Sequence, residues 1–393
     1  MRLVMVFPDP PLPFGDAAAR IYYVLVKGHV QNGHRVIVFC GSSKPEQHAR
    51  QLAEVFPSDR YDIRLYPHQG RRSGALAGKL MTIARPFSYM FSETLRRDLD
   101  AELARGFDAL HMSQLWAGWV GLKHVERSVL HIHYLFSIDL TGGKPKSLTE
   151  RVLRIAAVCA ERRLLRRYRV IASLTSRIAN AVKTVNPSAH TPVIATGLDL
   201  SLYEFPPVSK HQGPPTIGLI GSFFWDPTVS AAERLLKRLW PEIRRQVPEA
   251  QLRIVGRQAR TVLAEYVNAP GVSIDQDVED IQPYFHALDV MLYAPRIGSG
   301  IKVKITESMA TGVAVVTNTD GAEGLPIIDG VHADVTDDDA ELIARAVRLL
   351  KDPELRQRRR VAARQMLVDT FTDGHAVHQF EELYESMMKK NGV

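Results

Sequence analysis

The chain has 393 residues, more than a single hydrophobic core usually holds, so we expect two domains. Apolar residues make up 45% and charged residues 24% of the chain, a balance that excludes an intrinsically disordered protein. Residues 1–190 carry 28 Lys and Arg against 15 Asp and Glu, whereas residues 191–393 carry 22 against 28. The basic first half predicts an anionic partner, such as nucleic acid, a phospholipid surface or a phosphorylated substrate.

The two cysteines, Cys40 and Cys159, lack the spacing of metal ligands and favour a reducing compartment without disulfides. The N-terminal apolar run is stopped by prolines and is too short for the apolar region of a signal peptide. No run of about 18 apolar residues occurs in the sequence. We therefore expect a cytoplasmic protein, with peripheral attachment to the inner face of a membrane as an option.

In the first half, short β-branched runs alternate with helical patterns, which is typical of parallel sheets built from crossover units. The predicted strands are residues 2–8, 35–41, 62–67, 108–114, 128–134 and 169–175. The second half repeats this pattern, with predicted strands at residues 216–223, 251–257, 272–276, 289–295 and 313–319.

The proline-rich stretch 203–215 predicts a linker between the halves, and helical patterns occupy residues 338–368 and 373–393. We expect an α/β protein of two doubly wound, Rossmann-like domains that face each other across a cleft. The predicted domains are residues 1–205 and 206–372, with the helix 373–393 packing back on the first domain.

The sequence GSGIKVKITESMATG follows the fourth predicted strand of the second half. Gly298 and Gly300 let a ligand approach the backbone, and a helix that begins near Lys302 points unpaired amide groups into the loop. Such a helix start binds phosphate oxygens, and Lys302 and Lys304 add positive charge. The Glu307 carboxylate, about one turn further, can accept two hydrogen bonds from a ribose diol. The alternative is an ordinary helix cap with two surface lysines.

This sequence lies within APRIGSGIKVKITESMATGVAVVTNTDGAEGL, which closely resembles the donor-binding segment of the retaining GT-B glycosyltransferases of family 4. Weaker matches follow the order of that family along most of the chain, at residues 10–39, 191–207, 221–243, 250–257 and 277–295. The resemblance implies the GT-B fold and an enzyme that transfers a sugar from a nucleotide-diphosphate sugar with retained configuration. It implies no cofactor and no metal.

By this resemblance the second domain holds most of the donor. Glu307 would bind the ribose, and Lys302 and Lys304 would bind the diphosphate together with the amides of residues 299–301. Arg257 would assist them. The implied donor-binding residues are Gly15, Ser222, Arg257, Gly298, Ser299, Gly300, Ile301, Lys302, Lys304 and Glu307.

Three positions depart from the family pattern. Asp16 replaces the second glycine of a pair that begins at Gly15, and its carboxylate would repel a diphosphate unless it points toward the sugar or the acceptor. Asp16 is therefore a candidate catalytic residue. Ser299 stands where many relatives have a glutamate, but a subgroup with GSG here also lacks that acid, which favours variation over loss of activity. A basic pair is absent from GSFFWDP, so Lys302 and Lys304 are expected to supply part of the phosphate charge.

His133 ends a predicted strand before a long loop. By the resemblance, a histidine here hydrogen-bonds the sugar, which makes His133 the other candidate catalytic residue. The alternative is a satisfied core histidine, and this is the favoured interpretation of His131 and His111. Further candidates for the acceptor side, between which the sequence does not choose, are Gln114, Trp116 and Asp139.

Residues 71–97 and 146–170 combine basic and apolar side chains at helical spacing. Basic amphipathic helices bind anionic membranes, with about 1 kcal/mol gained for each cation near the surface. The alternative is a solvated charged face whose apolar side packs into the core. We expect no nucleic-acid binding, because the sequence has neither a stacking-aromatic pattern nor a recognition module.

Together these features favour a glycosyltransferase with a lipid-linked, polysaccharide or other glycoconjugate acceptor. A positively charged helix start would stabilise the departing diphosphate without a metal. The alternatives are a nucleotide-sugar epimerase or hydrolase on the same fold, and a catalytically degenerate protein that binds membrane surfaces. A dinucleotide-dependent dehydrogenase is less favoured, because GLIGSFF has only part of the three-glycine fingerprint. The donor sugar, its base, the acceptor, the linkage and the oligomeric state stay open.

Overall fold

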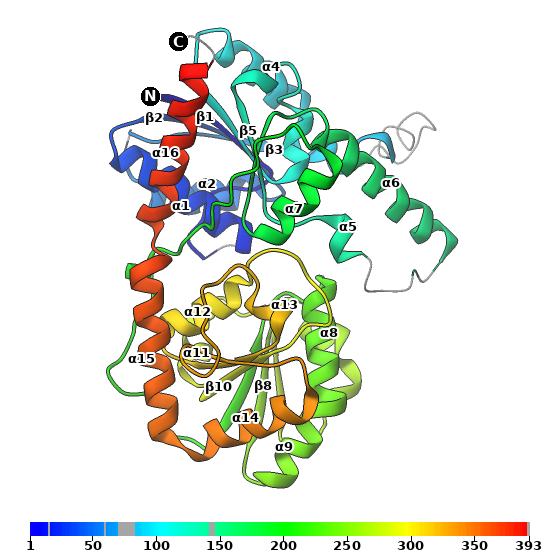
Figure 1. Cartoon of the computed structure of the whole chain (residues 1–393), viewed down its shortest axis with the longest axis vertical. Coiled ribbons are helices and arrows are strands. Elements are labelled where there is room, and N and C mark those ends of the chain that lie inside the picture. Colours follow the sequence, from blue (N-terminus) through cyan, green and yellow to red (C-terminus); the bar gives the residue numbers. More distant parts are fainter. Residues whose placement is uncertain (15, 59, 70–82, 141–144, 146, 391–393) are drawn as a thin grey trace. The chain divides into compact units, whose positions relative to one another are not determined.

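Figure 1 shows the computed structural model of the chain, which describes residues 1–14, 16–58, 60–69, 83–140, 145 and 147–390. The chain forms two compact units. Unit 1 comprises Met1–Leu198 and Asp373–Val393, and unit 2 comprises Asp199–Thr372. The first division between them falls seven residues before the predicted boundary at residue 205.

Unit 1 contains a parallel six-stranded sheet with the strand order β3-β2-β1-β4-β5-β6. Its strands are β1 (Arg2–Phe7), β2 (Arg35–Ser42), β3 (Asp62–Pro67), β4 (Ala109–Ser113), β5 (Ser128–Ile132) and β6 (Val170–Ser173). Its α-helices in the described residues are α1 (Ala17–Gln31), α2 (Pro45–Val55), α4 (Glu93–Leu103), α5 (Phe136–Asp139), α6 (Leu148–Leu165), α7 (Ser176–Val185) and α16 (Asp373–Lys390).

Unit 2 also contains a parallel six-stranded sheet, with the order β12-β11-β10-β7-β8-β9. Its strands are β7 (Thr216–Ile220), β8 (Gln251–Gly256), β9 (Val272–Gln276), β10 (Val290–Tyr293), β11 (Ala314–Thr317) and β12 (Asp334–Val335). Its α-helices are α8 (Asp226–Arg234), α9 (Trp240–Gln246), α10 (Ala259–Val262), α11 (Gln282–His286), α12 (Val303–Thr311), α13 (Thr319–Ala322), α14 (Asp339–Lys351) and α15 (Pro353–Thr370). Read backwards, this strand order is that of unit 1, and both follow the order typical of Rossmann folds.

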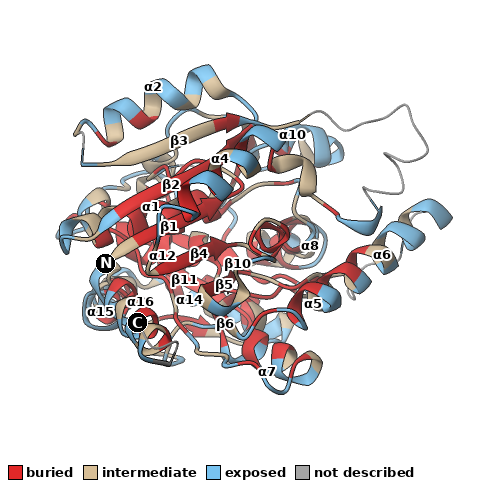
Figure 2. Ribbon diagram, turned by 90° about the horizontal axis from the view of Figure 1, so that it is seen from above, coloured by how far each residue is buried: buried red, intermediate tan, exposed pale blue. Residues whose placement is uncertain are grey.

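The central strands are buried on both faces, as Figure 2 shows for β1, β4 and β10, whereas the edge strand β3 is mostly half-buried. This burial explains why the strands are near-continuous apolar runs, as in β1, where five of the six residues are buried. All eleven predicted strands are present, and the prediction of an α/β protein with two Rossmann-like sheets is confirmed. The twelfth strand, β12, was not predicted, because its two residues are too few to give a sequence pattern.

The helical stretch predicted at 338–368 is present and consists of two helices, α14 and α15. Pro353 occupies the first turn of α15, where its missing N–H costs nothing, and Asp352 caps that helix by accepting a hydrogen bond from the Leu355 amide at 2.8 Å. A proline there cannot continue α14, because its ring would clash with the preceding turn.

The stretch 203–215, predicted as a linker, begins inside unit 2 and is held to it. The guanidinium of Arg360, on α15, is buried and donates hydrogen bonds to the carbonyl oxygens of Pro206 and Pro207 at 2.6 and 3.0 Å. Prolines have no N–H to donate, but their carbonyls still accept, and here they fix the segment to α15.

The C-terminal helix α16 belongs to unit 1 and packs against α1 (Figure 1). Phe380 and Tyr384 of α16 are completely buried. The hydroxyl of Tyr384 lies 2.6 Å from Nδ1 of His111 on β4, so α16 also completes the polar centre of the unit. Unit 1 is thus built from two segments that lie far apart in the sequence.

Candidate functional site

The predicted donor-binding loop connects β10 to α12, whose first residue is Val303. Gly300 adopts a φ of +79°, a left-handed conformation that favours glycine. The side chains of Thr317 and Asn318, at the end of the neighbouring β11, donate hydrogen bonds to the carbonyls of Tyr293 and Pro295 at 2.5 and 2.7 Å. The loop therefore begins from a fixed position at the carboxyl end of the sheet, where Rossmann folds bind their ligands.

Lys302 lies at the N-cap position of α12 and is buried, with 7% of its surface exposed. Its Nζ donates hydrogen bonds to the carbonyls of Gly298 and Gly300, at 3.1 and 2.5 Å, and lies 4.0 Å from a carboxylate oxygen of Glu323. The Lys302 ammonium group therefore joins two carbonyls of the loop and stabilises the loop's conformation. In this conformation it shapes the loop and adds positive charge beneath it.

Lys304 points its Nζ into the unit, where the amine donates a hydrogen bond of 2.6 Å to Oγ1 of the buried Thr228 on α8. The amine also lies 4.3 Å from the centre of the Tyr293 ring, a cation–π distance. The pKa of Lys304 is lowered to about 7, chiefly by loss of hydration and also by the nearby charge of Lys302, whereas Glu307 acts to raise it. An anion beside this amine would restore the protonated form.

Glycines at the ends of β7 and β8 allow close contacts beside the Lys304 amine. A Cβ at Gly221 would lie 2.7 Å from Nζ of Lys304, closer than side chains tolerate. Gly256, at the end of β8, has a φ of +153°, and a Cβ there would lie 1.7 Å from the Gly221 carbonyl oxygen. The end of β8 thus approaches the Gly221 carbonyl only because Gly256 lacks a side chain.

Glu307 lies on α12, one turn beyond Lys304, and has 4% of its surface exposed. Its Oε1 accepts a hydrogen bond of 3.1 Å from the hydroxyl of Tyr203, which is itself buried. Tyr203 was not predicted as a site residue. The sequence offered little signal for it, because it lies in the proline-rich stretch that was predicted as a linker.

The other predicted donor residues of unit 2 lie at the same edge of the sheet. Ser299 is buried in the loop and Ile301 is half-buried, while Ser222 follows β7 and is half-buried. Arg257 follows β8 and is exposed, and its carbonyl accepts a hydrogen bond of 2.9 Å from the Phe223 amide. The structure thus brings the predicted donor residues of unit 2 to one end of one sheet. Thr228, Gly221 and Gly256 lie beside them and were not predicted as site residues.

His133 lies in unit 1, directly after β5, with 7% of its surface exposed. Its Nε2 lies 2.9 Å from Oγ of Ser113, and its ring centre lies 5.8 Å from that of Tyr22. Burial lowers the pKa of His133 to about 3, so the imidazole is neutral at physiological pH. A neutral imidazole has a donor on one ring nitrogen and an acceptor on the other. Either nitrogen can therefore make one hydrogen bond with a sugar hydroxyl.

His131 and His111 are fully buried neighbours of His133, as expected for core histidines. The ring centres of His131 and His133 are 4.7 Å apart, and those of His111 and His131 are 5.4 Å apart. Burial lowers the pKa of both His111 and His131 well below the usual value, and the neighbouring histidines act in the same direction. The centre of unit 1 is therefore polar but uncharged.

Asp16 caps α1, with its Oδ1 accepting a hydrogen bond of 2.9 Å from the Ala19 amide. One carboxylate oxygen is thus committed to a helix start. Gly15 lies outside the described residues. Of the candidates for the acceptor side, Trp116 and Asp139 are buried, and Gln114 has a φ of +70° directly after β4. A non-glycine residue in this strained conformation is common at functional sites.

Family models match both units. Residues 18–202 match the model described as Glycosyltransferase Family 4, and residues 214–352 match the model described as Glycosyl transferases group 1. The chain belongs to the group 1, family 4 glycosyltransferases. It is a glycosyltransferase by both matches, and the sequence resemblance that predicted this family is confirmed.

Solved structures show the same GT-B fold. The glycosyltransferase is similar to sucrose-phosphate synthase from Thermosynechococcus elongatus, with a TM-score of 0.72, 16% identity and coverage of 99% of this chain and 100% of that one. It is also similar to HepE of Anabaena in complex with UDP and glucose, with a TM-score of 0.68, 15% identity and coverage of 98% and 100%.

A third structure is WaaG, a glycosyltransferase involved in lipopolysaccharide biosynthesis, with a TM-score of 0.66, 14% identity and coverage of 98% and 99%. A comparison with curated protein sequences gave no significant match. In the described residues of the glycosyltransferase, no helix is both long enough and apolar enough to span a bilayer.

Proposed function

We propose that the chain transfers a sugar from a nucleotide-diphosphate sugar to a glycan or lipid-linked acceptor, with retention of the anomeric configuration. The observation that carries this proposal is the start of α12. There, a desolvated Lys304 amine and the Glu307 carboxylate lie one turn apart, at the edge where a Rossmann sheet binds nucleotides. Uridine diphosphate sugars are the first donors to test, since the HepE structures contain UDP, UDP-glucose, or UDP with glucose.

In this proposal Glu307 binds the ribose hydroxyls, and the Tyr203 hydroxyl fixes the direction of the carboxylate. The start of α12 and Lys304 bind the diphosphate. When the bond between sugar and phosphate breaks, negative charge grows on the leaving diphosphate, and a positive charge already in place stabilises it without further rearrangement. Retention follows from the family resemblance, and the anomeric configuration of the product, measured by NMR, tests it.

The decisive experiment replaces Lys304 by Ala and Glu307 by Gln and measures both nucleotide-sugar affinity and transfer. A buried charge-assisted contact is worth about 2–3 kcal/mol, so each change should weaken donor binding by roughly 30- to 100-fold. Lys237→Ala is the matched control, because Lys237 is a half-exposed lysine of unit 2 that pairs with Glu233 and Glu265 on the surface.

If donor affinity and transfer survive both changes, the site is assigned wrongly. The same preparations, incubated with donor alone, distinguish a transferase from its rivals. An epimerase or hydrolase would convert the donor at its full rate without an acceptor, whereas a transferase needs one.

An anionic lipid surface is the proposed location of the acceptor, because α6 carries an exposed apolar stripe. Leu148, Val152 and Ile155, spaced four and three residues apart, are 80%, 57% and 56% exposed. Figures 1 and 2 show this end of α6 extending beyond the body of unit 1. The same helix ends at exposed arginines. The other segment expected to bind a membrane is 71–97. Its residues 71–82 lie outside the described residues.

Liposome co-sedimentation tests this location. Leu148→Asp with Val152→Asp should reduce binding to vesicles with anionic lipid by about tenfold and leave donor affinity unchanged. Val361→Asp, at an apolar residue of α15 that is 47% exposed, is the control. Equal binding of all three proteins would remove α6 from the proposal.

A further inference from the structure

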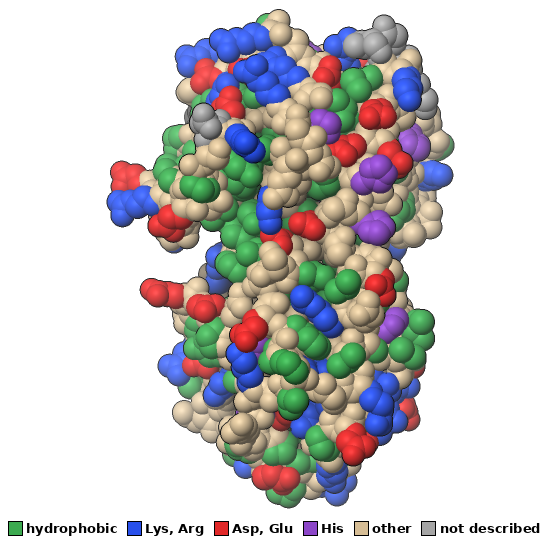
Figure 3. All heavy atoms as spheres, turned by 90° about the vertical axis from the view of Figure 1, so that its left-hand side faces the viewer, with side chains coloured by type: hydrophobic (Ala, Val, Ile, Leu, Met, Phe, Trp, Pro, Cys, Tyr) green, Lys and Arg blue, Asp and Glu red, His purple; other side chains and the backbone are tan. Residues whose placement is uncertain are grey.

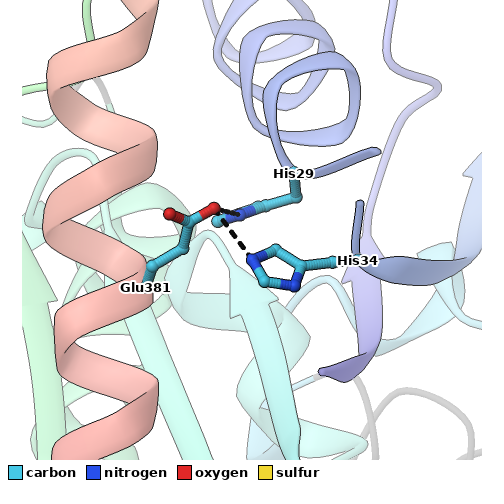
Figure 4. Close-up of side chains that lie close together, drawn as sticks. All are labelled: His29, His34 and Glu381. Carbon is cyan, nitrogen blue, oxygen red and sulfur yellow. Dashed lines mark hydrogen bonds and ion pairs between the residues drawn. The ribbon is translucent and has the colours of Figure 1, made fainter. Parts of the chain in front are cut away.

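A second group of chemically reactive side chains lies in unit 1, where α16 packs against α1 (Figure 4). His29 comes from α1, His34 lies just before β2, and Glu381 comes from α16. Oε1 of Glu381 lies 3.3 Å from Nδ1 of His29 and 3.0 Å from Nε2 of His34. These three atoms all lie within 4.8 Å of one another. Three elements therefore point one donor atom each at the same small volume.

The donor set is two imidazole nitrogens and one carboxylate oxygen. This combination binds Zn²⁺ in sites where three protein ligands leave a fourth position to water. Imidazole also suits Ni²⁺ and Cu²⁺, whereas Mg²⁺ and Ca²⁺ prefer oxygen donors alone. Among the residues that the structure describes, this is the one group of three or more His, Cys, Asp and Glu side chains close enough to hold an ion.

We infer that His29, His34 and Glu381 form a binding site for a divalent transition metal, with Zn²⁺ as the expected ion. The site is independent of the donor site, since its ligands lie in unit 1 and the donor residues of α12 lie in unit 2. Its role is structural. The ion joins the last helix of the chain to the first helix and to the start of β2.

The distances fit this inference with little rearrangement. In a tetrahedral zinc site with bonds of about 2.0–2.1 Å, neighbouring ligand atoms lie roughly 3.3 Å apart. The two distances from Oε1 of Glu381 are 3.3 and 3.0 Å, close to this length. The two imidazole nitrogens lie within 4.8 Å of one another, and His34 and Glu381 are partly exposed, at 17% and 15% of their side-chain surface.

The state of His29 also suits a metal ligand. Its side chain is completely buried, so the packing around the ring fixes its orientation. Its Nε2 is buried without a hydrogen-bond partner, so the ring makes its polar contact through the nitrogen that faces Glu381.

The alternative is a hydrogen-bonded clamp without an ion. In that arrangement Glu381 accepts hydrogen bonds from both imidazoles and from Nδ2 of Asn32 at 2.8 Å, and the Met1 amino group lies 3.1 Å from Nδ1 of His34. A metal bound by these two nitrogens would take the place of the imidazole protons that now face the carboxylate, and each neutral ring would then carry its proton on the other nitrogen, Nε2 of His29 and Nδ1 of His34. The clamp and the metal site therefore make different predictions for added zinc.

The surface around the site supplies a matched control. Histidine and acidic side chains lie side by side at several places on one face of unit 1 (Figure 3). One such pair is His378 and Glu382 of α16, whose side chains are 71% and 67% exposed and lie 3.4 Å apart. This pair has the same chemistry on the same helix, but it lacks a third ligand.

The test uses tag-free full-length protein, first treated with a chelator and then titrated with Zn²⁺ in a calorimeter. We expect one ion per chain and a rise of the unfolding temperature by about 3–5 °C at saturating zinc. Co²⁺ should give the intense visible absorption of a tetrahedral site. His34→Ala and Glu381→Gln should weaken zinc binding at least 100-fold and abolish the temperature shift, whereas His378→Ala should bind like the unmodified chain.

Three results would overturn the inference. One is the absence of stoichiometric binding by the unmodified chain. Another is zinc binding that His34→Ala and Glu381→Gln leave intact, which would place the ion elsewhere. The third concerns the unfolding temperature. If both variants lower the unfolding temperature equally with and without Zn²⁺, the three residues are a hydrogen-bonded clamp only. The partly exposed positions of His34 and Glu381 allow both variants to fold.

Discussion

The two units have the same strand order, but they bury different polar groups at the carboxyl ends of their central strands. Unit 1 has His111, His131 and His133, all neutral because burial lowers their pKa values. Unit 2 has Lys302 and Lys304 around the start of α12, each held by neutral hydrogen-bond acceptors. The polar groups buried in unit 1 are thus neutral histidines, whereas those of unit 2 include two lysines.

The proposed function assigns a different kind of ligand to each unit. A diphosphate is bound by positive charge and helix amides, and Lys302, Lys304 and the start of α12 lie at the switch point between β7 and β10. A sugar is uncharged and is recognised by hydrogen bonds and apolar contacts. In unit 1 the candidate for such a hydrogen bond is His133, since His111 and His131 are fully buried. The four predictions below separate these two roles.

The largest effect is expected from His133→Phe. If His133 hydrogen-bonds the reacting sugar, the rate of transfer should fall about 100-fold, since a contact made in the transition state is worth some 2–3 kcal/mol. Donor affinity should change less than twofold. Steady-state kinetics measure the rate of transfer, and calorimetry measures donor affinity. If the rate and the affinity fall equally, His133 acts in donor binding.

The next largest effect concerns pH. The amine of Lys304 has a lowered pKa of about 7, so it loses its proton as the pH rises through 7, and the free site becomes less positive. Donor affinity should therefore fall about tenfold between pH 7 and 8.5. In Lys304→Met, affinity should be weak at every pH. A pH dependence that persists in this variant would assign it to another group.

Tyr203→Phe should have a moderate effect of about three- to tenfold on donor affinity. The change removes one hydrogen bond to the Glu307 carboxylate and leaves the packing of the ring intact. As a control, Tyr266→Phe removes the hydroxyl of a more exposed tyrosine in the same unit. If Tyr203→Phe binds the donor as tightly as Tyr266→Phe does, the hydroxyl does not orient Glu307.

The smallest effect is on stability. The folded-state pKa of His131 lies below its unfolded value, so the unfolded chain binds more protons, and stability falls as the pH drops below about 6.5. In His131→Leu, the free energy of unfolding should fall less steeply with pH, by up to about 1.4 kcal/mol per pH unit. Urea unfolding at pH 7, 6 and 5 measures the slope, with the exposed His378→Leu as a control. If the free energy of unfolding changes equally with pH in all three proteins, His131 does not cause the loss of stability.

The strands were predictable because buried parallel strands are apolar throughout, and such runs stand out against the helical patterns between them. The start of α12 was predictable for a related reason: glycines, lysines and a carboxylate are close in the sequence, so their proximity in space is local. Both predictions rest on contacts within about ten residues.

Tertiary partners were not predictable in this way. Thr228 and Lys304 are 76 residues apart, and Tyr203 and Glu307 are 104 residues apart. Nothing in either local sequence indicates the other partner. Gly221 and Gly256 did offer a signal, since each stands at the end of an apolar run, but only the register of β7 and β8 reveals that their backbones approach one another.

The return of α16 to unit 1 has a consequence for synthesis on the ribosome. Translation proceeds from the N-terminus, so all of unit 2 is made before Phe380 and Tyr384 can cover the histidines of β4 and β5. Unit 2 can therefore finish folding first, although it comes second in the sequence. A nascent chain that stops before residue 373 leaves unit 1 with an open core, which makes it a substrate for chaperones and proteases.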